Sequence, residues 1–154
     1  MKWKRSESAA GNARRALPKL VEKYFSAGRK AANGKSSPKE LHRFRIATKK
    51  FRYALELFRP VYGASLEQRL KSLRQLQDVL GKLNDYQTVL ELLHKDKKLA
   101  GKLQRQVKHK SKEFHQTWKT FDADGELQKW KNYLNRKQRR RPAELGRKTP
   151  QAGA

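Results

Sequence analysis

Four side chains that can donate hydrogen bonds or carry positive charge recur along the stretch from residue 41 to residue 58. They are His42, Arg45, Lys49 and Arg52, at spacings i, i+3, i+7 and i+10. On a helix, these spacings place the four side chains in one row. Guanidinium, ammonium and imidazole groups suit charge-assisted hydrogen bonds to anionic oxygens. The row therefore predicts a binding site for a polyanion.

The row lies beside the apolar stripe of the same predicted helix. This stripe consists of Leu41, Phe44, Thr48, Phe51, Leu55 and Phe58. A helix that needs charge only for solubility carries it on the face opposite its apolar stripe. Cations at the margin of a low-dielectric core repel one another unless an anion lies among them. The position of the row thus favours a ligand site over an ordinary solvated face.

The overall charge also indicates an anionic partner. The 154 residues include 39 Lys and Arg against 14 Asp and Glu, for a net charge of +25. Such an excess fits nucleic acid, an anionic membrane surface or an inorganic polyanion. The absence of cysteine excludes disulfides and thiolate metal sites. No apolar run approaches the roughly 18 residues of a membrane span, and the first residues lack the apolar segment of a secretory signal, so we expect a cytoplasmic protein.

Apolar periodicity predicts an all-α fold, an antiparallel bundle of about four main helices. We expect these helices at about residues 9–32, 38–58, 64–94 and 99–121, with a short fifth at 127–134. Ser37, Pro38 and Glu40 have the spacing of a capping box at the start of the second helix. Gly81 interrupts the third helix and predicts close packing or a bend. Residues 1–8 are expected to be frayed, 9–134 to form the bundle, and 135–154 to be a disordered basic tail.

Short connections make neighbouring helices antiparallel, which brings further cations toward the row. Folding the second and third helices about Tyr62 places Arg52 opposite about residue 72 and Lys49 opposite about residue 75. Arg74 then lies across from the row. The same pairing brings Asn84 and Asp85 beside His42.

Three more basic residues are further candidates. Arg29 and Lys30 end the first helix, just before the second helix begins, so we expect them near its His42 end. Lys110 falls within the apolar stripe of the fourth helix. It either extends its ammonium group to solvent or reaches into the groove.

The sequence resembles the CHAD domains (conserved histidine α-helical domains) in two motifs and, more weakly, in a third. The first is His42-x-x-Arg45-x-x-x-Lys49-Lys50-x-Arg52. The second is Leu73-Arg74-x-Leu76-Gln77-x-x-Leu80-Gly81-x-x-Asn84-Asp85, and the third is Trp118-x-x-Phe121.

This resemblance implies a helical fold whose basic helices line a pore or groove that binds inorganic polyphosphate without catalysis. Carried over by position, the implied polyphosphate-binding residues are His42, Arg45, Lys49, Lys50, Arg52 and Arg74. Lys50 lies off the row on a helical wheel, so its assignment rests on the resemblance alone. Family members often carry two helical halves, whereas this chain shows one His motif. Either two copies form a homodimer that completes the groove, or one bundle suffices.

Other functions are less well supported by the residues. His94, His109 and His115 do not supply three ligands on one helical face, so we expect no metal and no cofactor. No Gly-rich phosphate loop or Ser-His-Asp arrangement is present, and Asp78 and Asp85 are not clustered with other acidic residues, which argues against an enzyme.

The serious alternative is an RNA- or DNA-binding basic module that would take nucleic acid as a competing ligand. Single-strand binders place aromatic rings among their cations. Most aromatic residues here fall on core stripes, but Tyr53 flanks the row and keeps this alternative open.

Overall fold

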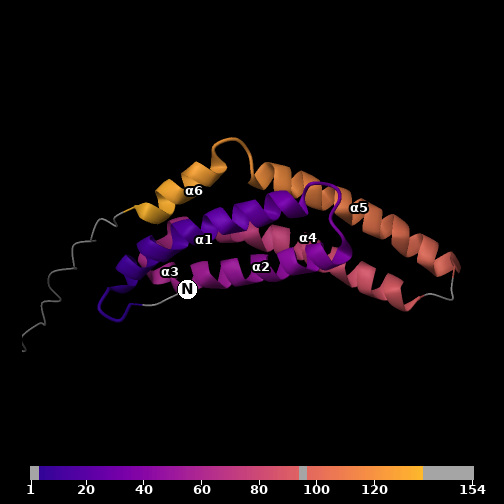
Figure 1. The fold of residues 1–154 in the computed structure, drawn as a ribbon, viewed down its shortest axis with the longest axis horizontal. Coiled ribbons are helices and arrows are strands. Elements are labelled where there is room, and N and C mark those ends of the chain that lie inside the picture. Colours follow the sequence, from indigo (N-terminus) through magenta and orange to yellow (C-terminus); the bar gives the residue numbers. More distant parts are fainter. Residues whose placement is uncertain (1–3, 94–96, 137–154) are drawn as a thin grey trace, which may run out of the picture.

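The computed structural model describes residues 4–93 and 97–136, and helices make up most of them. In chain order these are α1 (Ala9–Ala31), α2 (Pro38–Leu57), α3 (Arg59–Tyr62), the 3-10 turn η1 (Gly63–Leu66), α4 (Glu67–Leu92), α5 (Lys97–Phe121) and α6 (Glu126–Asn135). No strand occurs in the described ranges. The prediction of an all-α helical bundle is therefore confirmed (Figure 1).

Helix α2 begins where the capping box predicted. The Glu40 backbone N–H donates to the Ser37 hydroxyl at 3.3 Å, and the Ser37 backbone N–H donates to the Glu40 carboxylate at 2.7 Å. The backbone N–H of Ser37 also lowers the pKa of Glu40 because it stabilises the carboxylate. This local cap sets the first residue of the helix that carries the cationic row.

The connection between α2 and α4 is longer than the sequence indicated. We expected the third helix from about residue 64, but α3 and η1 occupy residues 59–66 and α4 starts at Glu67. Gly63 has φ of +66°, a left-handed conformation that glycine adopts without steric cost. Because α2 and α4 pack side by side after this connection, its length decides which of their residues face each other.

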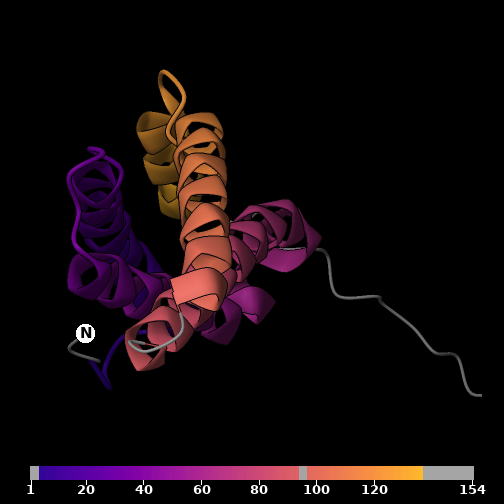
Figure 2. The same ribbon diagram turned by 90° about the vertical axis from the view of Figure 1, so that its right-hand side faces the viewer.

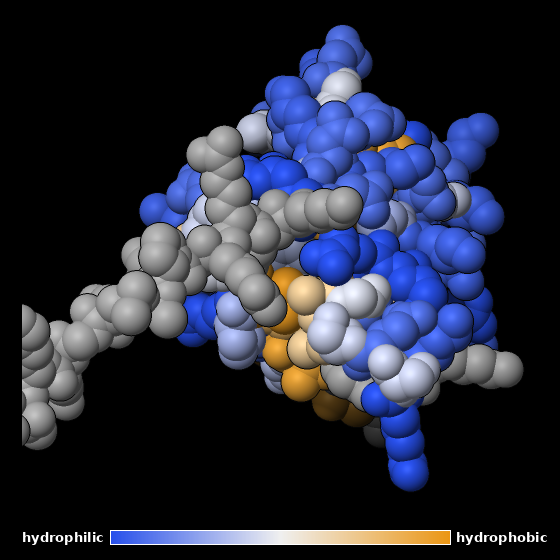
Figure 3. All heavy atoms as spheres, turned by 90° about the vertical axis from the view of Figure 1, so that its left-hand side faces the viewer, coloured by the Kyte–Doolittle hydropathy of each residue, from blue (hydrophilic) through white to orange (hydrophobic). Residues whose placement is uncertain are grey.

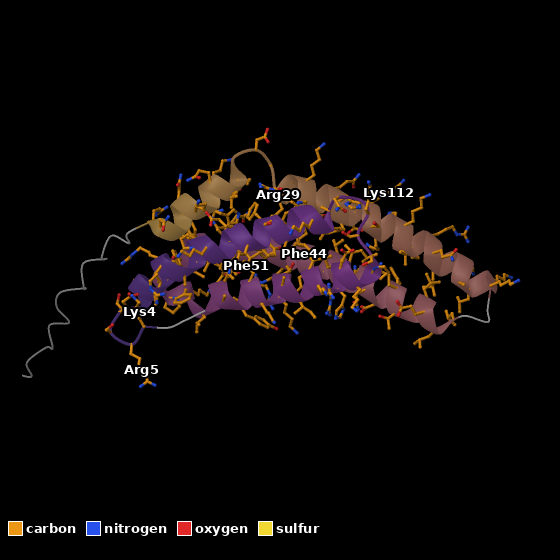
Figure 4. All side chains as sticks on the ribbon, viewed as in Figure 1. Lys4, Arg5, Arg29, Phe44, Phe51 and Lys112 are labelled. Atoms are coloured by element: carbon orange, nitrogen blue, oxygen red, sulfur yellow. The ribbon has the colours of Figure 1, made fainter. Side chains whose placement is uncertain are left out.

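An aromatic cluster forms the centre of the core. Its rings belong to Tyr24, Phe25, Phe44, Phe51, Trp118, Phe121 and Trp130. Figure 4 shows Phe44 and Phe51 on α2. Gly28 of α1 lies directly against Trp118, because a Cβ atom at Gly28 would lie 1.9 Å from a carbon of the indole ring. Close approach of α1 and α5 thus requires glycine at this position.

The second half of α4 and the first part of α5 form a two-helix arm. Residues 84–93 and 97–113 include no buried residue, whereas Phe114, Trp118 and Phe121 of the same α5 are buried. Figure 1 shows the far end of this arm projecting beyond α1 and α2, and Figure 2 looks onto that end. The arm therefore exposes much of α5 to solvent.

Residues at the start of the described chain fold back onto α1. The Lys4 backbone N–H donates to the Asn12 side-chain oxygen at 2.8 Å, and the Asn12 amide donates to the Lys4 carbonyl at 2.9 Å. Figure 3 views the end of the molecule formed by α6 and the start of α1, and hydrophilic residues cover most of it around a small apolar area. The predicted disordered tail falls almost entirely outside the described residues, as does His94.

Candidate polyanion-binding groove

Helices α2 and α4 pack against each other and leave a groove between them. Its volume is about 380 Å³. Its lining residues are Arg45, Lys49, Gln77, Asp78, Gly81, Lys82 and Asp85. Two members of the predicted cationic row, Arg45 and Lys49, therefore face the same groove, and α4 contributes a third cation, Lys82.

Arg45 has an unsatisfied donor. The side chain is partly buried, and its Nε atom is buried without a hydrogen-bond acceptor among the residues that the structure describes. A buried polar group left without a partner costs about 1–3 kcal/mol. Arg45 also lines the groove, so an anion that drew its guanidinium group outward would give this donor an acceptor, and Arg45 is the residue that most directly indicates a ligand.

His42 is held at the end of the row by α4. Its Nδ1 atom lies 2.6 Å from Oδ1 of Asn84. An amide oxygen only accepts hydrogen bonds, so Nδ1 is the protonated nitrogen. The Nε2 atom can therefore donate to an anion only when the imidazole carries a second proton.

Arg52 is fixed by contacts within the protein. Its Nε donates to the Gln77 side chain at 2.9 Å, and a terminal nitrogen donates to Glu56 at 2.5 Å. The guanidinium carbon also lies 4.5 Å from the centre of the Tyr53 ring. The Nζ atom of Lys49 lies 5.7 Å from the same ring centre, but the side chain remains exposed. Arg52 is thus held by contacts within the protein and does not line the groove, whereas the exposed Lys49 side chain can move toward a ligand.

Arg74 lies beside Arg52, but carboxylates separate the two. Arg74 donates to Glu67 at 2.8 Å and lies 3.8 Å from Glu56, which also binds Arg52. The hydrogen bond from Arg74 lowers the pKa of Glu67. This end of the row is therefore an ion-pair network, unlike the uncompensated cations that we expected.

The predicted pairing of α2 and α4 differs from the structure at the Arg52 end. The Arg52 side chain contacts Gln77, where we expected a residue near position 72. The connection through α3 and η1 makes α4 start at Glu67, later than the predicted residue 64. The prediction that Asn84 lies beside His42 is confirmed by their hydrogen bond.

The other candidate residues do not line the groove. Arg29 donates to both carboxylate oxygens of Asp122 at 2.7 Å, and these bonds raise its pKa. Lys30 borders a different surface hollow, on α1. Lys110 donates to Glu113 at 2.5 Å. Lys50 is exposed and absent from the groove lining.

Several groove residues on α4 were not predicted as site residues. Asp78 and Asp85 both line the groove, although we had considered them isolated. They are seven residues apart, about 10 Å along a helix, so a single metal ion would not contact both. Within the described ranges no three His, Asp or Glu side chains are grouped for metal binding. The sequence could have indicated these two residues, because their helical spacing places them beside the leucine stripe of α4.

Gly81 forms part of the groove wall. A Cβ atom at this position would meet no heavy atom within 4 Å. Of the two roles predicted for Gly81, close packing or a bend, close packing is therefore wrong. Its lack of a side chain instead widens the groove next to Arg45 and Lys49.

The fold and the groove define an all-α protein with basic, acidic and amide side chains between two antiparallel helices. The family model of the CHAD domain matches residues 1–94, a partial-length copy of the domain, and the chain belongs to this family. The match includes both helices of the groove but excludes α5, and with it the weaker Trp118-x-x-Phe121 resemblance. Comparison with curated proteins and with solved structures found no match. No helix in the described ranges is long and apolar enough to cross a membrane.

Proposed function

We propose that the groove between α2 and α4 binds inorganic polyphosphate and that the protein acts as a noncatalytic binding module. Membership of the CHAD family supports this ligand class. The single observation that carries the proposal is the buried, unpartnered Nε of Arg45 at a groove that Lys49 and Lys82 also line. These are the donors that a chain of phosphates requires.

The shape of the groove fits a thin, flexible polyanion. Polyphosphate carries charge along its whole length and has no bases to recognise. A groove with cations on both walls can contact such a chain from two sides, which offsets the entropy lost when the chain is ordered. Asp78 and Asp85 restrict where phosphates can lie, because like charges repel. We therefore expect the chain to run on the side of Arg45 and Lys49.

His42 is a further candidate contact under this proposal. Asn84 holds its ring at the end of the row, with Nδ1 2.6 Å from the amide oxygen. The His42→Gln variant should therefore lose part of the affinity for polyphosphate.

Titration with labelled polyphosphate tests the proposal. Arg45→Met removes the donor while keeping the apolar part of the side chain, and a charged hydrogen bond contributes about 1.5–3 kcal/mol. We expect a loss of affinity of about tenfold or more with unchanged or increased stability. The double variant Lys19→Gln, Lys23→Gln on the exposed face of α1 is the control for lost charge. Equal effects of Arg45→Met and this control would contradict a specific groove.

Competition decides between polyphosphate and nucleic acid as the groove ligand. Single-stranded RNA and polyphosphate are compared at equal phosphate concentration and matched salt. The Tyr53 ring, which would be needed for base stacking, is already in contact with Arg52, so polyphosphate should bind more tightly. Displacement of polyphosphate by RNA would favour the nucleic-acid alternative. Formation of a homodimer stays a prediction, which light scattering with and without polyphosphate tests.

A further inference from the structure

Helix α5 carries much of the charge that the groove does not use. It contains eight Lys and Arg residues and one acidic residue, Glu113. We define the α5 row as the basic residues that follow one another at heptad-like spacing along this helix. The row consists of Lys98, Lys102, Arg105, His109, Lys112 and Lys119. It spans about 31 Å of helix.

Every residue of the α5 row is exposed. The opposite side of the helix holds the half-buried Leu103 and Val107 and the buried Phe114 and Trp118. Figure 4 marks Lys112 on α5. The part of the row within residues 97–113 belongs to the projecting arm, where no described element covers it (Figure 1).

The Lys and Arg side chains of the α5 row have no ion-pair partner within the described part of the protein. Glu113 is bound to Lys110, which lies outside the row, and no described carboxylate forms an ion pair with a residue of the row. By contrast, Glu56 and Glu67 neutralise the arginines beside the groove. Like charges three or four residues apart destabilise a helix. The row is therefore a surface that an external anion would stabilise.

We propose that the α5 row binds the phosphate backbone of double-helical nucleic acid without reading its sequence. A straight row on a convex helix contacts a ligand from one side only. A flexible polyphosphate would lose chain entropy in such a contact, whereas a rigid duplex already presents its phosphates in a fixed array. This surface is separate from the groove and lies outside the residues that match the family model.

Other anionic partners fit the α5 row less well. All three large aromatic residues of α5, Phe114, Trp118 and Phe121, are buried, so the helix offers no exposed Phe, Tyr or Trp ring on which single-stranded bases could stack. The large apolar residues exposed on the arm, Val89, Leu92 and Leu99, lie toward its far end and do not follow the row, so the row has no apolar stripe to enter a bilayer. These features favour backbone contacts to a duplex over single strands or membranes.

Fluorescence anisotropy with duplexes of unrelated sequence tests the proposal in the full chain. The test variant is Lys102→Gln, Arg105→Gln, Lys112→Gln. The control, Lys19→Gln, Lys23→Gln, Lys35→Gln, removes three exposed cations from another surface. Three lost phosphate contacts should weaken duplex binding on the order of 100-fold at 0.1 M salt and reduce the slope of log K against log salt by about 2.7. The control variant should change the duplex affinity and the salt slope by much less.

The groove variant separates this proposal from the proposed function. Arg45→Met should lower polyphosphate affinity and leave duplex affinity unchanged. The α5 variant should lower duplex affinity and leave polyphosphate affinity in the groove unchanged. A duplex affinity of the α5 variant equal to that of the control would overturn the α5 proposal, whatever happens to polyphosphate. Tighter binding of single strands or of anionic lipid vesicles than of duplex would also overturn it, as would complete loss of duplex binding after deletion of residues 137–154.

Discussion

Replacing Gly81 should stabilise the fold and weaken ligand binding at the same time. Glycine inside a helix is destabilising by about 0.5–1 kcal/mol relative to alanine. A Cβ atom at Gly81 meets no neighbour within 4 Å, so no steric cost opposes this gain. Gly81→Ala should therefore raise the free energy of unfolding by about 0.5–1 kcal/mol and the melting temperature by about 1–4 °C.

A longer side chain at the same position should obstruct the groove. Gly81→Gln places a flexible chain beside Arg45 and Lys49, and we expect polyphosphate affinity to fall about tenfold or more, which corresponds to about 1.4 kcal/mol. Gly101 provides a matched control, because it is also helical, has open space at its Cβ position and lies on α5. Gly101→Ala and Gly101→Gln should leave polyphosphate binding unchanged.

Stability is measured by urea unfolding, and affinity by titration with labelled polyphosphate. Destabilisation by Gly81→Ala would show that the space beside Gly81 is not open in solution. A stable Gly81→Gln variant with wild-type affinity, alongside a weakened Arg45→Met variant, would show that the ligand does not pass Gly81. Either result would refute the assignment of this residue to the ligand path.

Three further predictions concern stability. Gly28→Ala should lower the free energy of unfolding by about 1–3 kcal/mol in urea, because the new Cβ atom clashes with Trp118. Thr48→Val should cost about 1–3 kcal/mol, since it leaves the buried Tyr24 hydroxyl without its partner at 3.2 Å, and adding Tyr24→Phe should recover most of this loss. The pKa of Glu67 is lowered from 4.5, so the unfolded chain takes up its proton at higher pH. Stability should fall as the pH drops below about 4.5, and Glu67→Gln should weaken this dependence in acid titrations followed by circular dichroism.

Features that depend on neighbouring residues were predicted well from the sequence. The capping box around Ser37, the range of α1 and the apolar stripe of α2 all agree with the structure. Each depends on residues within about one helical turn of one another, whose spacing can be read directly from the chain. The family motifs also lie within single helices, which is why the resemblance was visible before the fold was known.

The composition of the site depended on contacts between distant residues. The sequence indicated that a cationic row would lie at the edge of the core, and the antiparallel arrangement of α2 and α4 followed from a short connection. It did not show that Arg74 would join the local i, i+4 pair of Arg52 and Glu56, or that Arg29 would pair with Asp122, 93 residues away. These two contacts depend on how helices pack against one another, which local spacing does not specify.

The sequence by itself therefore determined the helices and their apolar faces and indicated a polyanion as the ligand, because these follow from local spacing and net charge. Only the tertiary structure decided which cations would remain available to such a ligand. Packing buried the Nε of Arg45 without an acceptor and opened the groove at Gly81. It also covered the apolar side of α5 and left its basic side exposed. Burial and ion pairing are properties of the assembled surface, and local sequence patterns do not contain them.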